Sequence, residues 1–188
     1  MLETDTWETL RHFRQALYDD LGLRQDSLFE LMDAALTAPH RSTLVRLSLT
    51  AVFRRRWPST CDALADGSID VAALRDLFVR SLADSAVVEG RPLWVIDGTN
   101  WPRPAARAST DRTWEYRRLP GWPQNGVVPA WAYQWLVAVP DVAGSWVLPL
   151  DVQHRKPTAK SATEVALEQI AAVRKAQSAS AASSRHAR

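Results

Sequence analysis

Residues 93–98 read Leu-Trp-Val-Ile-Asp-Gly, and the sequence changes character at this stretch. The four apolar residues Leu93–Ile96 form a short continuous run, which is typical of a buried β-strand. Gly90-Arg-Pro comes before the run and Gly98 follows it, so residues that interrupt regular structure stand on both sides. The stretch therefore predicts a strand with Asp97 at its end.

The residues before this strand have helical periodicity. Apolar residues recur at helical spacing over residues 7–21, and Gly22 suits the position just past a helix end. Ser27 and Glu30 form a capping-box pattern, which predicts a second helix running through Leu36.

Two further helices are expected before residue 90. One is predicted from Ser42 towards Trp57, with Pro58 as its limit. Asp70 can cap the other. Residues 1–89 are therefore expected to form a helical bundle.

Beyond Asp97 the sequence predicts a loop rich in Pro and Arg, followed by two more strands. The loop covers residues 98–129, and residues 131–139 read as the second strand. Residues 146–150 read as the third, in which Pro149 indicates a bulge or an edge position.

A last helix is predicted after the strands. Ser161 and Glu164 form a capping box that opens it. Residues 176–188 are rich in Ala and Ser without apolar periodicity, so we expect a disordered tail. The expected fold is α+β, with a helical domain at 1–89 and a sheet-containing domain at 90–175.

The composition excludes several classes of protein. Of the 188 residues 46% are hydrophobic and 23% charged, which suits a packed globular core. No apolar run approaches the roughly 18 residues of a membrane span, and the acidic N-terminus does not resemble a secretory signal. Cys61 is the single cysteine, which fits a reducing compartment, and we expect a cytoplasmic protein without membrane contact.

Charge is distributed unevenly along the chain. Residues 1–90 contain ten Arg, no Lys and fourteen acidic residues, a net charge of −4. Residues 91–188 contain thirteen basic and seven acidic residues, a net charge of +6. The second half is therefore the part expected to meet a polyanion, although ordinary surface charge is the preferred explanation of +6 taken alone.

Asp97 is the residue best placed to carry chemistry. A carboxylate held rigidly at the end of a strand is what a hard divalent cation requires. On residues 97–100 alone, however, the favoured interpretation is that an Asp before a Gly makes a turn. Two enzyme classes with similar letters fit less well. Thr99 stands where an aspartate-nucleophile phosphatase needs a second Asp, and Trp101 and Pro102 are too bulky for the phosphate loop of a sugar kinase.

A longer pattern is more specific. Residues 97–112 read DGTNWPRPAARASTDR, residues 133–136 read Tyr-Gln-Trp-Leu and residues 145–151 read Ser-Trp-Val-Leu-Pro-Leu-Asp. A helix with Glu164, Val165, Glu168, Gln169 and Ile170 follows. Together these segments resemble bacterial insertion-sequence transposases of the DDE endonuclease superfamily, in the IS701-like branch, over about residues 90–172.

The resemblance implies the first part of an RNase H-like fold, with three strands and a helix. It implies DNA transposition, in which two Mg²⁺ ions held by Asp, Asp and Glu cleave a phosphodiester bond and transfer the strand. Asp97 would be the first catalytic residue and a ligand of both metals. The implied partners are DNA at the transposon ends and a second copy or a full-length transposase.

The chain departs from the family pattern after the last helix. The second Asp should end a further strand there, but the Ala/Ser-rich tail follows instead, and the final Glu has no place either. Asp151 corresponds to a non-catalytic Asp of the family. We therefore expect a truncated transposase that is inactive alone, with weak or absent Mg²⁺ binding. The alternative is a non-catalytic regulator that binds DNA or a full-length transposase.

Arginines and tryptophans are concentrated after Asp97. The candidate DNA-binding residues are Arg103, Arg107, Arg112, Arg117 and Arg118. The tryptophans near them could stack on bases, but because seven of the nine lie between residues 94 and 146, we expect them to pack the core of the sheet. A carbohydrate-binding module would instead require tryptophans exposed in a flat row.

Overall fold

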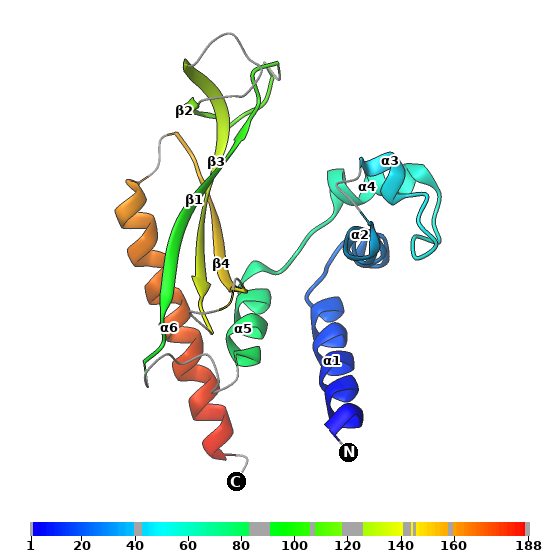
Figure 1. Cartoon of the computed structure of the whole chain (residues 1–188), viewed down its shortest axis with the longest axis vertical. Helices are drawn as coiled ribbons and strands as arrows, with labels where there is room; N and C mark the ends of the chain where they lie inside the picture. The colour runs from blue at the N-terminus through cyan, green and yellow to red at the C-terminus, as the bar shows by residue number, and fades with distance from the viewer. Residues whose placement is uncertain are drawn as a thin grey trace. The chain divides into compact units, whose positions relative to one another are not determined.

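The computed structural model describes residues 2–39, 43–82, 91–105, 108–117, 126–140, 144, 146–157 and 160–186. The elements, coloured in chain order in Figure 1, are α1 (Leu2–Asp19), α2 (Gln25–Thr37), α3 (Leu44–Leu47), α4 (Trp57–Asp66), α5 (Val71–Ser81), β1 (Trp94–Pro102), β2 (Thr113–Arg117), β3 (Gly126–Ala138), β4 (Leu148–Arg155) and α6 (Ala162–His186). The α+β class expected from the sequence is confirmed.

The chain divides into two compact units, Met1–Leu77 and Phe78–Arg188. The division falls inside α5, earlier than the boundary at residue 89 that the sequence indicated. The last turn of α5 packs with the sheet, because Val79 is buried in the same apolar cluster as Leu136 and Leu150. None of the described helices is both long and apolar enough to span a membrane.

In the helical unit, the predicted capping box of Ser27 and Glu30 is wrong. The helix α2 begins earlier, at Gln25, and both residues are buried inside it. Glu30 instead accepts a hydrogen bond from the backbone N–H of Arg54 at 3.0 Å and forms ion pairs with Arg54 and Arg55. These arginines therefore tie the loop after α3 to α2.

The predicted helix from Ser42 to Trp57 is also wrong. The short α3 ends at Leu47, and α4 begins at Trp57, with Pro58 in its first turn. The N–H groups of the first helical turn have no acceptor within the helix, so a proline there costs no hydrogen bond. Proline is therefore more common at the start of a helix than at its end. The cap predicted for α5 is confirmed, since Asp70 Oδ1 accepts from the N–H groups of Ala72 and Ala73 at 3.0 Å.

The second unit is built on an antiparallel sheet around the long strand β3. β1 pairs with β3 along one edge, from Trp94 opposite Ala138 to Pro102 opposite Ala130. β2 and β4 share the other edge of β3, β2 at its start and β4 at its end. The ladder is irregular at Leu136, where Pro149 and Asp151 face neighbouring residues of β3, so the bulge predicted at Pro149 is confirmed.

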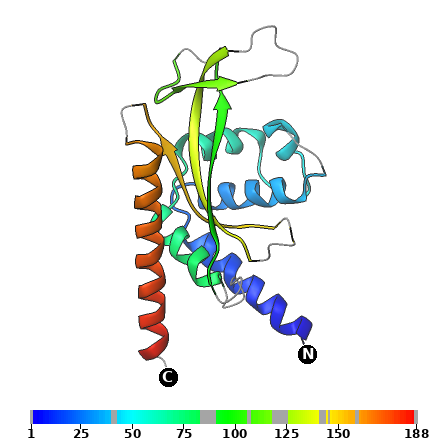
Figure 2. The same ribbon diagram turned by 60° about the vertical axis from the view of Figure 1, so that its left-hand side comes forward.

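One face of this sheet is covered by α6. The helix runs along the strands in both ribbon views (Figures 1 and 2), and Val173 and Ala176 pack against Leu136 and Leu150. A buried amide pair adds polar contacts, because Gln169 donates to the carbonyl of Gln134 at 3.1 Å. The capping box that opens α6 is confirmed by the reciprocal bonds of Ser161 and Glu164, described below.

Three details of this unit differ from the sequence prediction. The described residues form four strands rather than three, because β2 and the start of β3 lie within the expected loop at 98–129. Strand β1 continues to Pro102, so Asp97 lies within the strand and not at its end. Residues 177–186 continue α6 to His186, where the sequence indicated a disordered tail, because adding residues to an existing helix avoids the cost of nucleation and the segment contains neither Gly nor Pro.

Candidate functional site

Asp97 lies on β1 opposite Trp135 of β3, with Val152 of β4 opposite Trp135 on the far side. Its side chain is exposed. One carboxylate oxygen, Oδ1, accepts a hydrogen bond from the backbone N–H of Gly98 at 2.7 Å. A rigid strand therefore presents this carboxylate to solvent.

The two faces of the sheet differ in burial, because side chains alternate along each strand. Along β3, Ala130, Ala132, Gln134, Leu136 and Ala138 are buried and lie on the face that α6 covers, which we call the α6 face. The opposite face we call the Asp97 face. By register it carries Asp97, Thr99, Trp101, Trp114, Tyr116, Trp131, Tyr133, Trp135, Val152 and His154.

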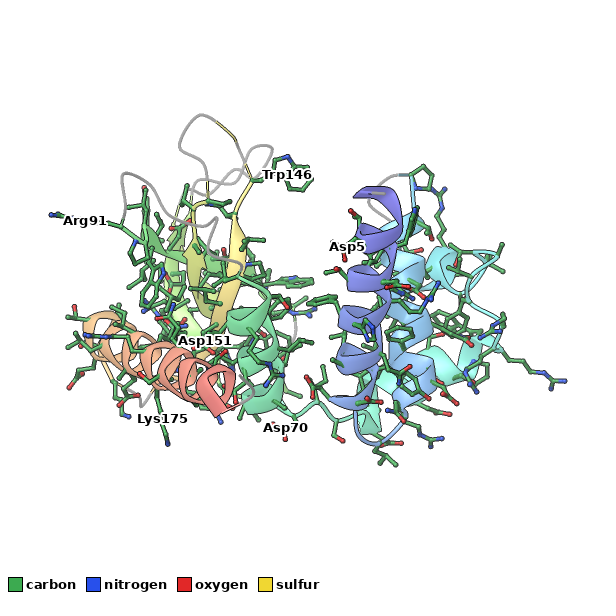
Figure 3. All side chains as sticks on the ribbon, turned by 90° about the horizontal axis from the view of Figure 1, so that it is seen from below. Asp5, Asp70, Arg91, Trp146, Asp151 and Lys175 are labelled. Atoms are coloured by element: carbon green, nitrogen blue, oxygen red, sulfur yellow. The ribbon has the colours of Figure 1, made fainter. Side chains whose placement is uncertain are left out.

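Asp151 lies on the α6 face. It is opposite Leu136, is only 6% exposed and accepts a hydrogen bond from Gln153 Nε2 at 3.3 Å. Figure 3 labels Asp151 beside α6, on the side of the sheet which that helix covers. Asp97 and Asp151 therefore point to opposite sides of the sheet and cannot share a cation.

No group of three or more His, Cys, Asp or Glu side chains converges into a metal site within the described ranges. On the Asp97 face, Asp97 is accompanied mainly by aromatic rings. These residues by themselves do not fit a centre for two divalent ions, which needs several oxygen ligands on the same side.

Two of the five candidate arginines have described side chains. The guanidinium carbon of Arg103 lies over the rings of Trp101 and Trp131, at 5.1 and 4.6 Å from their centroids. Arg112 donates to the carbonyl of Arg103 at 3.1 Å. Arg117 is the last residue of β2, and Arg107 and Arg118 lie outside the described residues.

The expectation that the tryptophans pack the sheet core is wrong for several of them. Trp101, Trp114 and Trp146 are 59%, 74% and 84% exposed. Trp101 and Trp114 lie on the Asp97 face, whereas Trp146 precedes β4 and projects away from the sheet (Figure 3). A signal that could have indicated exposed rings is the sequence of residues 130–135, where Trp131, Tyr133 and Trp135 alternate with Ala130, Ala132 and Gln134 and therefore share one face of the strand.

Other rings of this face pack on one another. Tyr133 stacks on His154 with centroids 5.0 Å apart, and Trp131 meets His154 edge-on at 6.2 Å. The indole N–H of Trp131 donates to the carbonyl of Thr110 at 2.9 Å. Residues far apart in sequence therefore form one ordered aromatic surface, which the sequence prediction did not include.

The helical unit contains a hollow of about 710 Å³ between α1, α2 and Arg54. Two of the arginines that line it, Arg14 and Arg54, are engaged by carboxylates. Arg14 makes two hydrogen bonds of 2.8 Å to Asp33 and lies over the Phe29 ring, and the bonds to Asp33 raise the pKa of Arg14. A hydrogen bond from Tyr18 lowers the pKa of Asp26 at the same place. These contacts explain the hollow as part of the packing of α1 on α2.

A family model described as DDE superfamily endonuclease matches residues 16–182 of the chain. The match begins in the last turn of α1 and includes α2 to α5, the four described strands and most of α6. No curated protein and no solved structure matches the chain.

Proposed function

Because the chain belongs to the DDE superfamily of endonucleases, we propose that it is part of a DNA transposase, of the IS701-like branch, that acts in the cytoplasm. The observation that supports this most directly is Asp97. It is an exposed carboxylate on a central segment of the matched region, held on a strand with one backbone hydrogen bond. It would be the first of the three carboxylates of a DDE site.

The order of elements supports an RNase H-like fold as part of the same proposal. β1, β3 and β4 form an antiparallel meander, and α6 follows and covers one face. In the proposed fold a further strand pairs with the outer edge of β1 and brings the second Asp beside Asp97. That edge has no strand partner in the part of the chain that the structure describes.

DDE superfamily endonucleases depend on divalent metal ions and act on DNA. Asp97 would supply one carboxylate to such ions, but Asp151 points away from it and the described residues form no group of three metal-binding side chains. We therefore propose that residues 1–188 alone do not cleave DNA, since the two-metal reaction needs several converging ligands.

The five arginines after Asp97 are proposed to contact the phosphate backbone. Arg103 supports this most clearly, because two tryptophan rings fix its guanidinium near the Asp97 face. A cation held in place by ring contacts loses little side-chain entropy when it binds a phosphate. Arg107, Arg112, Arg117 and Arg118 are included because they belong to the same segment of sequence.

The catalytic part of the proposal is tested with a nicking assay on supercoiled plasmid, with Mg²⁺ or Mn²⁺ present. We expect the native chain and Asp97→Ala to show the same background, because one carboxylate cannot position two metal ions. Cleavage by the native chain that is lost in Asp97→Ala would contradict this. It would show that further carboxylates reach Asp97, for example from a second copy.

A second candidate function is regulation of a complete transposase by binding its DNA or the protein itself. The isolation of Asp97 from other carboxylates among the described residues favours it. The two functions differ in their effect on a complete transposase. A regulator should bind transposon-end DNA equally well as native chain and as Asp97→Ala, and should reduce cleavage by a complete transposase added to the same reaction.

A further inference from the structure

Large aromatic rings on the Asp97 face are exposed to solvent. Trp101 and Trp114 are both more than half exposed, and Tyr116 on β2 is 65% exposed. Tyr133 and His154, by contrast, are stacked on each other. Burying a tryptophan or tyrosine ring is favourable, so rings left in solvent on an ordered strand are available to a ligand.

The register places these rings close together and in line with Asp97. Trp101 is directly opposite Trp131, and Trp114 is opposite Pro129, the next residue of β3 on the same face. Trp101 is four residues from Asp97 along β1, which corresponds to roughly 13 Å at the rise of a β-strand. The rings therefore begin within about four base steps of the carboxylate, at 3.4 Å per step.

A positively charged side chain lies beside these aromatic rings. Arg103 is held between Trp101 and Trp131, and the part of the chain that contains the sheet, residues 91–188, carries a net charge of +6. A surface that combines flat exposed rings with a fixed guanidinium suits a ligand that has both planar apolar groups and anionic groups. Nucleic acid is the ligand class that repeats both.

We propose that the Asp97 face binds an unpaired DNA strand, whose bases stack on Trp101 and Trp114 while Arg103 contacts a phosphate. The inference rests on the proposed function, because it takes DNA as the substrate. The strand must be unpaired because the faces of bases in a duplex are already stacked on their neighbours, whereas a flipped or single-stranded base offers its face to a ring. The rings would hold bases next to the position where Asp97 acts.

The experiment measures fluorescence anisotropy of labelled oligo(dT), of a duplex of equal length and of an abasic strand with the same phosphates, all with EDTA present. The native chain should bind oligo(dT) more tightly than the abasic strand. Trp101→Ala and Trp114→Ala should each weaken oligo(dT) binding by roughly five- to a hundred-fold, the range expected for loss of one stacked base. Trp101→Phe and Trp114→Phe keep a ring and should restore most of the affinity.

The matched control is Trp146→Ala, because Trp146 is more exposed than either ring and projects away from the sheet. It should leave binding unchanged. Circular dichroism of every variant separates loss of a ring from loss of the fold, and the Phe variants keep the test valid if an Ala variant unfolds.

The outcomes distinguish this inference from the proposed function. Equal affinity for oligo(dT) and the abasic strand, or preference for the duplex with no effect of either Trp→Ala change, would overturn base stacking and leave a DNA-binding transposase intact. If the variants alter self-association or binding of a soluble glucan but not of DNA, the face has another occupant and the inference fails. Absence of binding to all three nucleic acids would overturn both.

Discussion

At the residue scale, Asp97 shows what a local pattern can and cannot predict. The short apolar run before it predicts a strand, and the strand is present. Gly98 led to the expectation that the strand ends there, since Gly commonly marks a turn. The strand continues because β3 is long enough to pair with every residue as far as Pro102, and that pairing is a tertiary property that a six-residue window does not contain.

Gly98 provides the first prediction at this scale. No described atom lies within 4 Å of the place where a Cβ would stand, and a glycine inside a strand costs conformational entropy. Gly98→Ala should therefore fold normally and raise the free energy of unfolding by about 0.4–1 kcal/mol, because the unfolded chain loses freedom. Urea denaturation compares the two proteins.

A clear loss of stability in Gly98→Ala would contradict this account of the strand. A different result would be informative about function. The variant could instead be as stable as the native chain but bind DNA less tightly. In that case the ligand, and not the fold, requires the space that a Cβ at residue 98 would fill.

At the element scale, two identical capping patterns have different outcomes. At α6 the backbone N–H of Ser161 donates to Glu164 Oε2 at 2.7 Å, and the N–H of Glu164 donates to Ser161 Oγ at 3.3 Å. At α2 the corresponding residues, Ser27 and Glu30, lie inside the helix. There the Glu30 carboxylate binds Arg54 from the loop after α3, through a backbone hydrogen bond and an ion pair. A sequence pattern identifies candidate caps, but a distant partner can take the same carboxylate.

The capping box of α6 gives a pH prediction. The bonds from the backbone and hydroxyl of Ser161 lower the pKa of Glu164 below its ordinary value of 4.5, so the folded state prefers the ionised carboxylate. A lowered pKa contributes stability above the unfolded value, and that contribution disappears as the pH falls through the folded value. The native chain should therefore have a higher melting temperature than the Glu164→Gln variant at neutral pH.

The measurement is the melting temperature of both proteins from neutral pH down to below the ordinary pKa of a carboxyl group. The gap between them should close in the acidic range, where the native carboxyl is protonated and as neutral as the amide of the variant. A gap that persists unchanged at low pH would show that the Glu164→Gln change disturbs packing, and that ionisation of the cap contributes little.

At the scale of the whole molecule, the sequence predicted the class of fold, the change from helices to strands and the family. It did not predict that the aromatic residues of the sheet divide between two faces. Trp101 and Trp114 were expected in the core because they belong to the seven tryptophans concentrated between residues 94 and 146. Only the register against β3 shows that α6 covers the opposite face, so the core forms from small residues such as Ala132 and Ala138.

The last prediction concerns the response of the whole chain to metal ions. A ligand that binds the folded state raises its stability in proportion to the logarithm of its concentration relative to Kd. One exposed carboxylate gives weak binding, because Mg²⁺ keeps its waters unless several oxygen ligands converge. By register the Asp97 face carries no second carboxylate among the described residues, since Asp151 lies on the α6 face. Millimolar Mg²⁺, Mn²⁺ or EDTA should therefore leave the melting temperature of the native chain unchanged, and Asp97→Ala should melt at the same temperature as the native chain. Differential scanning fluorimetry at fixed ionic strength tests both statements. A rise with Mg²⁺ that disappears in Asp97→Ala would mean that other carboxylates complete the site, and dilution of the protein would then distinguish ligands within one chain from ligands supplied by a second copy.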